Sequence, residues 1–390
     1  MTRPLPLNRR LFLAGATAGV GLAHVGRVAA QTRGPRNKLI VMVARGAMDG
    51  LSVTVPTGDA DYRPLRGALA IEGARDLGHG FGLHPAMETL YGLHQAGQMR
   101  WAPAVAIPVR VRSHFDAQDV LENGGEGLRQ QTDGWLNRAL TAAGGGPVKA
   151  LSIGAQTPLI LRGAAETSSW APGVAVAGQD RIAALLQDLY VEDRLLADSL
   201  ARGLETEAMA AEMGEGMAVR RNDVPGLGAA VARLMTGEQG ADVVALSVDG
   251  WDTHARQNGQ LQARLQGLDQ LIGGLKDGLG AEWDRTALIV ATEFGRTARA
   301  NGTGGTDHGT GSSLLLAGGA VTSGGPIGDW PGLAEARLFE GRDLAPTLDV
   351  RGVFKGVLRD HLGVDRSALD ARVFPNSAAE APAVDGLIRV

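Results

Sequence analysis

The 390-residue chain contains no cysteine. This absence excludes a disulfide framework, thiolate metal sites and a cysteine nucleophile. Aromatic residues make up only 4% of the chain, and the formal net charge is −4, with no basic block that would hold a phosphate backbone. Nucleic acid is therefore disfavoured as a partner.

Several enzyme signatures are also missing. The chain has no G-x-x-x-x-G-K-[ST] phosphate loop, no G-x-S-x-G nucleophile elbow and no H-E-x-x-H zinc motif. No G-x-G-x-x-G follows the first predicted strand, which argues against a dinucleotide-binding fold.

The composition present is that of a globular protein, with 44% hydrophobic and 21% charged residues. The 57 glycines show no Gly-X-Y period and indicate loop-rich connections. No linker divides the chain after residue 30, so we expect a single domain over 31–390 with a helical insertion near 182–217, where apolar residues recur at helical spacing.

Residues 1–30 have the features of an export signal. They contain no acid, and Arg9-Arg10 directly precedes an apolar run over 11–23 that is shorter than the about 20 residues a bilayer span needs. The segment resembles a twin-arginine signal, with an ordinary secretory signal or an uncleaved anchor as alternatives. The small residues Val28-Ala29-Ala30 predict cleavage after Ala30. We expect a periplasmic protein that meets the Tat translocase during export and keeps no stable membrane span after cleavage.

Apolar runs of strand length alternate with amphipathic helices. The predicted strands are 38–43, 99–107, 150–154 with 159–161 close behind, 243–248, 287–292 and 313–317, and the predicted helices are 85–96, 116–123, 258–279 and 343–362. This alternation predicts an α/β fold with a mostly parallel central sheet covered by helices on both faces.

Three of these strands lead to an acidic residue, namely Asp49, Asp249 and Glu293. Ligands of open α/β sheets bind at the carboxyl ends of strands. Carboxylates gathered at that edge need a cation or a proton, because like charges do not stay close unpaired.

Two short motifs combine carboxylates with imidazoles. Asp252 and His254 follow the strand 243–248, and Asp307 and His308 lie in a glycine-rich stretch over 301–313. Carboxylate oxygen and imidazole nitrogen are ligands of zinc, manganese and iron sites. The alternative for the first motif is a solvated loop in which Asp252 orients His254, and for His308 a structural or exposed histidine.

Two further motifs contain candidate anion-binding groups. Arg296 either neutralises Glu293 as a structural pair or grips an anionic substrate. Ser113 precedes a helical stretch, where its hydroxyl either caps the helix or acts as a nucleophile. Arg112 adds positive charge that would bind an oxyanion. His114 could be a metal ligand, an acid/base catalyst or a structural residue, and the sequence does not decide among these roles.

A set of motifs across the chain resembles a known family. These are the export signal, RGAMDGL, RSHFDAQD, DGWDTH, EFGRT, GTDHG and the terminal VFP. They look like the exported proteins called domain of unknown function fifteen-oh-one, placed in the alkaline-phosphatase-like superfamily with sulfatases and phosphomutases. The resemblance extends from about Asn37 to Pro375.

The superfamily template implies metal binding by Asp49, Asp252, His254 and His308, with Ser113 as nucleophile. Two departures weaken a full two-metal site. Asp252 and His254 are closer in sequence than the template's pair, and Phe294 stands where the second site would have an imidazole.

We therefore expect an exported metal-dependent hydrolase of phosphate or sulfate esters, acting on an anionic small-molecule or polymeric substrate. Its divalent metal would be zinc, manganese or calcium, held by the residues Asp49, Asp252, His254, Glu293, Asp307 and His308. Ser113, His114, Arg112 and Arg296 are the expected catalytic residues. The alternative is a non-catalytic periplasmic binding or accessory protein on the same scaffold, which the Phe294 departure favours.

Overall fold

The computed structural model describes residues 36–143, 148–154, 156–172, 200–201, 203–204, 223–237 and 240–389. Residues 37–390 form a unit of their own. The predicted signal over 1–30 lies outside the described residues, as does nearly all of the predicted insertion over 182–217; its described residues 200–201 and 203–204 are helical. Within the described residues, no helix combines the length and apolar character that a bilayer span requires.

The main sheet has eight strands in the order β11-β5-β10-β9-β1-β8-β6-β7. Their bounds are β1 (Lys38–Arg45), β5 (Met99–Ala106), β6 (Ala150–Ile153), β7 (Thr167–Trp170), β8 (Val243–Asp249), β9 (Thr286–Ala291), β10 (Ser312–Ala317) and β11 (Leu348–Asp349). β10 pairs antiparallel with both of its neighbours, whereas the other pairs in this sheet are parallel. The prediction of an α/β fold with a mostly parallel sheet is confirmed.

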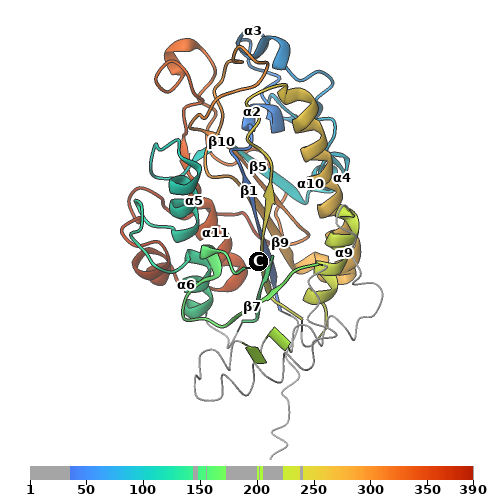
Figure 1. Cartoon of the computed structure of the whole chain (residues 1–390), viewed down its shortest axis with the longest axis vertical. Helices are drawn as coiled ribbons and strands as arrows, with labels where there is room; N and C mark the ends of the chain where they lie inside the picture. The colour runs from blue at the N-terminus through green and yellow to red at the C-terminus, as the bar shows by residue number, and fades with distance from the viewer. Residues whose placement is uncertain are drawn as a thin grey trace, which may run out of the picture. The chain divides into compact units, whose positions relative to one another are not determined.

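Helices cover both faces of the sheet (Figure 1). One layer contains α5 (His114–Asn123), α6 (Trp135–Ala142) and α11 (Val350–Leu362), and the other contains α4 (Glu88–Gln95), α9 (Val224–Met235) and α10 (Gln257–Leu279). β1 supplies alternate residues to the two cores, with Leu39, Val41 and Val43 in one and Ile40, Met42 and Ala44 in the other. This double burial explains why β1 reads as a continuous apolar run.

The remaining elements are short. They include α2 (Gly50–Val53), α3 (Tyr62–Arg66), α12 (Arg366–Ala368) and a three-stranded sheet of β2 (Thr54–Val55), β4 (Phe81–Leu83) and β3 (Arg75–Gly78). The predicted strand candidate at 159–161 is wrong, because Leu159–Leu161 forms a single 3₁₀ turn. The sequence prediction also missed α6, α9, β7 and β11, of which the two strands are too short to give a clear alternation.

The direction of β10 brings distant loops together. β5, β8 and β9 end at the same edge of the sheet because they run parallel to β1. β10 runs the opposite way and therefore begins at that edge. The loops after β5, β8 and β9 and the loop before β10 thus meet there, and these loops contain the motifs singled out above.

Candidate metal centre

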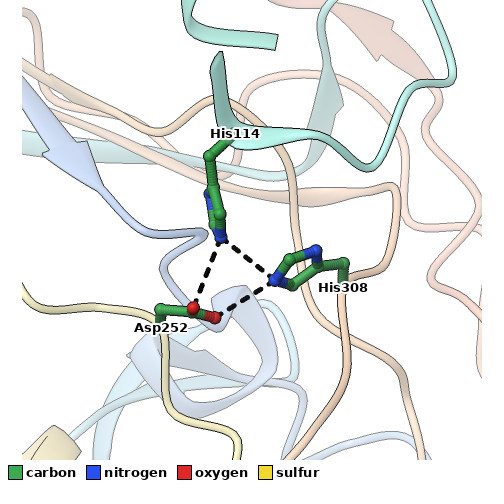
Figure 2. A group of neighbouring side chains, drawn as sticks. All are labelled: His114, Asp252 and His308. Carbon is green, nitrogen blue, oxygen red and sulfur yellow. Dashed lines mark hydrogen bonds and ion pairs between the residues drawn. The ribbon is translucent and has the colours of Figure 1, made fainter. Parts of the chain in front are cut away.

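Four side chains from three segments converge at this edge. Asp252 and His254 lie in the loop after β8, His308 lies just before β10, and His114 is the first residue of α5. Figure 2 shows His114, Asp252 and His308 pointing toward one another, and their nearest ligand atoms all lie within 4.8 Å of each other.

The contacts centre on Nε2 of His308. This atom lies 3.0 Å from Nε2 of His114, 3.0 Å from Nε2 of His254 and 3.2 Å from Oδ1 of Asp252. Nε2 of His254 lies 2.9 Å from the same Asp252 oxygen, and Nε2 of His114 lies 3.6 Å from Oδ2. All three imidazoles thus present the same ring nitrogen to one small volume.

The opposite ring nitrogens have hydrogen-bond acceptors of their own. Nδ1 of His308 donates to the carbonyl oxygen of Arg112 at 2.8 Å, and this oxygen can only accept. Nδ1 of His114 donates to Glu293 at 2.8 Å, and Nδ1 of His254 donates to Asp307 at 3.3 Å. With the proton of the neutral ring on Nδ1 in His114 and His308, the Nε2 atom of each keeps a lone pair. His254 has a carboxylate oxygen next to each of its ring nitrogens, at 2.9 Å from Nε2 and 3.3 Å from Nδ1.

The lone pairs of His114 and His308 and the Asp252 carboxylate repel one another unless a cation or extra protons lie between them. With metal bonds of about 2.0–2.1 Å, the ligand atoms of a tetrahedral site are about 3.3 Å apart. The contacts within the cluster run from 2.9 to 3.6 Å, and the ligand atoms of His114, Asp252 and His308 all lie within 4.8 Å of one another. These three side chains therefore fit one divalent cation, and His254 lies beside them, in contact with His308 and Asp252.

Glycines allow the contributing loops to pack against each other. A Cβ at Gly305 would lie 2.3 Å from the backbone carbon of His254, and one at Gly309 would lie 2.4 Å from that of Arg296. The glycine-rich stretch predicted to approach a ligand thus approaches the neighbouring ligand-bearing loops.

The site is accessible from solvent. The side chains of His254 and Asp252 are 46% and 43% exposed, whereas those of His114 and His308 are 22% and 24% exposed. Burial raises the pKa of Asp252, but the hydrogen bond and charge of Arg296 outweigh it, so this pKa is lowered overall. The hydrogen bond to Glu293 raises the pKa of His114.

The family model described as "Protein of unknown function (DUF1501)" matches residues 36–373. The chain belongs to this family. The predicted family is thus confirmed. No curated protein matches the chain.

Solved structures similar to this DUF1501 chain include members of the alkaline phosphatase superfamily. The C-terminal periplasmic domain of EcEptC from Escherichia coli, in complex with Zn, has 8% identity and a TM-score of 0.43, covering 87% of this chain and 86% of that one. The lipoteichoic acid synthase LtaP from Listeria monocytogenes has 9% identity and a TM-score of 0.39, covering 87% and 76%. A protein in the alkaline phosphatase superfamily from Vibrio parahaemolyticus has 11% identity and a TM-score of 0.35, covering 76% and 63%.

In this DUF1501 chain, the carboxylates of Glu293 and Asp307 were predicted as metal ligands, but they contact the Nδ1 atoms of His114 and His254. Glu293 is fully buried and accepts bonds from His114, Gly46 N–H at 2.8 Å and Gln118 at 3.0 Å. Burial raises the pKa of Glu293, but the bonds from His114 and Gln118 keep it below its ordinary value. Asp307 accepts from His254 and from Asn301 at 3.1 Å, and these bonds lower its pKa. Both carboxylates therefore orient imidazoles, as carboxylate–histidine–metal arrangements do.

Asp49 lies apart from the cluster. Its carboxylate is 1% exposed and is held by the fully buried Arg66, by Ser52 at 2.8 Å and by Gln257. All three groups bind Oδ2, and Asp49 is not part of the group that could hold a metal among the described residues, so the structure gives Asp49 a role in holding the loop after β1.

The two arginines predicted to bind substrate oxygens contact protein carboxylates. Arg296 is buried and donates to Asp252 at 2.6 Å, and also to Thr306. Arg112 donates to Glu340 at 2.7 Å and to Asp343 at 2.8 Å. Both guanidinium groups therefore position neighbouring residues, Arg296 by fixing the orientation of the Asp252 carboxylate.

Ser113 is exposed and is the N-cap of α5, where its Oγ accepts a long 3.5 Å bond from Asp116 N–H. The next residue, His114, enters the cluster, a role that the sequence left open.

Phe294 stacks on His114, with ring centroids 4.9 Å apart, and lies 5.2 Å from the ring of His308. This position makes Phe294 an apolar support for two imidazoles. Among the described residues, the cluster of His114, Asp252 and His308, with His254 beside it, is the one group that could hold a metal.

Proposed function

We propose that this protein is a metal-dependent hydrolase of phosphate or sulfate esters, with a single divalent cation held by His114, Asp252, His254 and His308. The observation that carries the proposal is the convergence of three imidazole Nε2 atoms on one carboxylate at a solvent-accessible sheet edge. A divalent cation at this position would supply Lewis-acid chemistry toward an ester oxygen.

The donor set limits the choice of metal. Three imidazole nitrogens and one carboxylate suit zinc, manganese or iron, whereas calcium prefers a shell of oxygens. Of the metals expected from the sequence, we therefore propose zinc or manganese, and calcium is the poorest match.

We retain Ser113 as the proposed nucleophile. Its hydroxyl is exposed beside the ligand His114, and the one long bond it accepts leaves its proton without an acceptor among the described residues. Attack by Oγ would form a seryl phosphate or sulfate ester and release the alcohol. Water would then release the inorganic acid and restore the hydroxyl.

The first test is metal content of the protein purified without chelators, measured by mass spectrometry beside Asp252→Ala and His308→Ala. Asp249→Asn is the matched control, because this carboxylate is at the end of β8, close to Asp252 in the chain, but has no hydrogen-bond or ion-pair partner among the described residues. We expect near-stoichiometric metal in the wild type and the control, and none in the two ligand variants. Equal metal in all four proteins would overturn the site.

The second test is turnover of methyl phosphate, p-nitrophenyl phosphate and p-nitrophenyl sulfate by the metal-loaded protein. We expect Ser113→Ala to retain metal and to lose turnover by about three orders of magnitude or more. Retained turnover in this variant would assign the attack to water. Metal binding with no turnover of any ester would favour the accessory-protein alternative.

We also propose export to the periplasm by the twin-arginine route, on the strength of the Arg9-Arg10 pair and the apolar run over 11–23. Residues 1–30 fused to a folded reporter should direct it to the periplasm. Replacement of both arginines by lysine should retain the reporter in the cytoplasm. Export of the double variant would indicate an ordinary secretory signal.

A further inference from the structure

A cleft of about 630 Å³ opens beside the metal centre. Its wall is formed by one face of α5, by the ends of β1 and β8 and by the segment around Thr157. Phe115, which lines the cleft, directly follows His114 in the chain, and Gln118, also in the lining, donates to the Glu293 carboxylate that holds His114. The cleft and the metal centre therefore share the N-terminal turns of α5. Its volume lies in the range of ligand-binding pockets.

The cleft contains an unusually exposed aromatic ring. Phe115 is 89% exposed, and the other exposed large apolar residue among the described ones, Leu128, is 44% exposed and does not line the cleft. An exposed phenyl ring at a cleft next to a metal centre contributes nothing to the core and offers a flat apolar surface to a ligand.

The charges of the cleft argue against an anionic ligand group there. Its lining contains three carboxylates, including Asp249, and two guanidinium groups, Arg45 and Arg162. The Arg45 guanidinium is already bound by Glu122, by Ser247 at 2.8 Å and by Gln118 at 2.5 Å. A phosphate or sulfate group would meet the excess carboxylate charge, so the metal centre is the better place for it.

The polar groups suit a ligand with many hydroxyls. Asp249 is exposed and has no hydrogen-bond or ion-pair partner among the described residues, so both of its oxygens can accept. Gln156 and Thr157 add an amide and a hydroxyl to the same lining. A single phenyl ring lacks the cage of aromatic residues that recognises quaternary ammonium.

We propose that this cleft binds a neutral saccharide unit, with one face of the sugar ring on Phe115 and its hydroxyls hydrogen-bonded to Asp249 and its neighbours. This proposal rests on the proposed ester hydrolase, since it makes the alcohol portion of the ester a sugar. The ester group then lies at the metal centre while the cleft selects the sugar.

Direct binding tests the cleft without requiring turnover. Saturation-transfer NMR would use methyl glucoside, methyl galactoside and methyl N-acetylglucosaminide on the wild type, the metal-site variant Asp252→Ala, Phe115→Ala and Leu128→Ala. We expect transfer from wild type, Asp252→Ala and the matched control Leu128→Ala, and an about tenfold weaker affinity in Phe115→Ala. Phe115→Trp should restore binding, because it keeps an aromatic face.

Kinetics separates the sugar from the ester group. Glucose 6-phosphate and glucose 6-sulfate would be compared with methyl phosphate and methyl sulfate. Phe115→Ala should raise KM for the sugar esters about tenfold with kcat within about twofold, and should leave the methyl esters unchanged.

The outcomes distinguish the two proposals. Saccharide binding without turnover of any ester would overturn the proposed hydrolase activity and would leave the proposed saccharide cleft unaffected. Turnover of methyl esters with no saccharide transfer, or with equal transfer in Phe115→Ala, would overturn the cleft assignment alone. Tighter binding of choline than of the three glycosides would also overturn it in favour of a cationic ligand.

Discussion

Nε2 of His114 lies 3.0 Å from Nε2 of His308, although Nδ1 of each ring already donates a proton to an acceptor elsewhere. Two imidazoles in this arrangement cannot hydrogen-bond to each other while both are neutral. A divalent cation removes the conflict, because it accepts both lone pairs at once.

Removal of the metal should destabilise the fold. The cation would tie α5 to the loop after β8 and to the loop before β10, and it binds the folded state only. At a free metal concentration one hundred times the dissociation constant, this linkage contributes about 2.7 kcal/mol to the free energy of unfolding. Thermal unfolding with and without a chelator checks it. If the chelator lowered the stability of Asp252→Ala by the same amount, the chelator would be acting at a place other than this metal site.

Glu293→Gln should weaken metal affinity about 10- to 100-fold, because the neutral amide holds the His114 ring less firmly than the carboxylate does. Competition with a chromogenic chelator measures this affinity. The matched control is Asp269→Asn, another buried carboxylate that accepts backbone N–H groups, here from Thr89 and Leu90 at 2.9 Å each. A comparable loss of affinity in the control would mean that general destabilisation explains the result.

Asp49→Asn should lower the free energy of unfolding by about 3–5 kcal/mol, because it leaves the fully buried Arg66 guanidinium without its counter-charge. Metal content should stay unchanged, since Asp49 lies apart from the ligand cluster. Denaturant unfolding and metal analysis on the same sample check both parts. Loss of metal from a variant that remains folded would place Asp49 among the ligands after all.

His84 should make the fold sensitive to mild acid. Burial lowers its pKa to about 4, and its Nδ1 accepts a 3.1 Å bond from Ala86 N–H, which requires an unprotonated nitrogen. Because the folded pKa lies below the unfolded value of 6.5, the contribution is complete above pH 6.5 and is lost as the pH falls toward 4.

His84→Asn retains an acceptor in place of Nδ1 but does not titrate. Between pH 7 and pH 5 the wild type should therefore lose about 2 kcal/mol more stability than this variant. Denaturant unfolding at the two pH values measures the difference. Parallel losses in the two proteins would show that other groups account for the acid sensitivity.

The sequence by itself determined the sheet and part of the site. Because β1, β8 and β9 are buried on both faces, their sequences are continuous apolar runs, and these runs predicted the strands without tertiary information. The pairs Asp252 with His254 and Asp307 with His308 were found because metal-ligand chemistry was concentrated within a few residues at strand ends. The short elements β7 and β11 escaped prediction because they contain too few residues for a pattern.

Only the tertiary structure decided which polar residues enter the cluster. His114 reaches His308 across 194 positions of sequence, and the orientation of its ring depends on Glu293, 179 positions away. Asp49 was a plausible ligand from its place after a strand, but in the structure Arg66 and Gln257 bind its carboxylate. The physical reason is that an ionised side chain takes the partner that the packed fold places nearest, and a local motif does not record which distant segment will supply that partner.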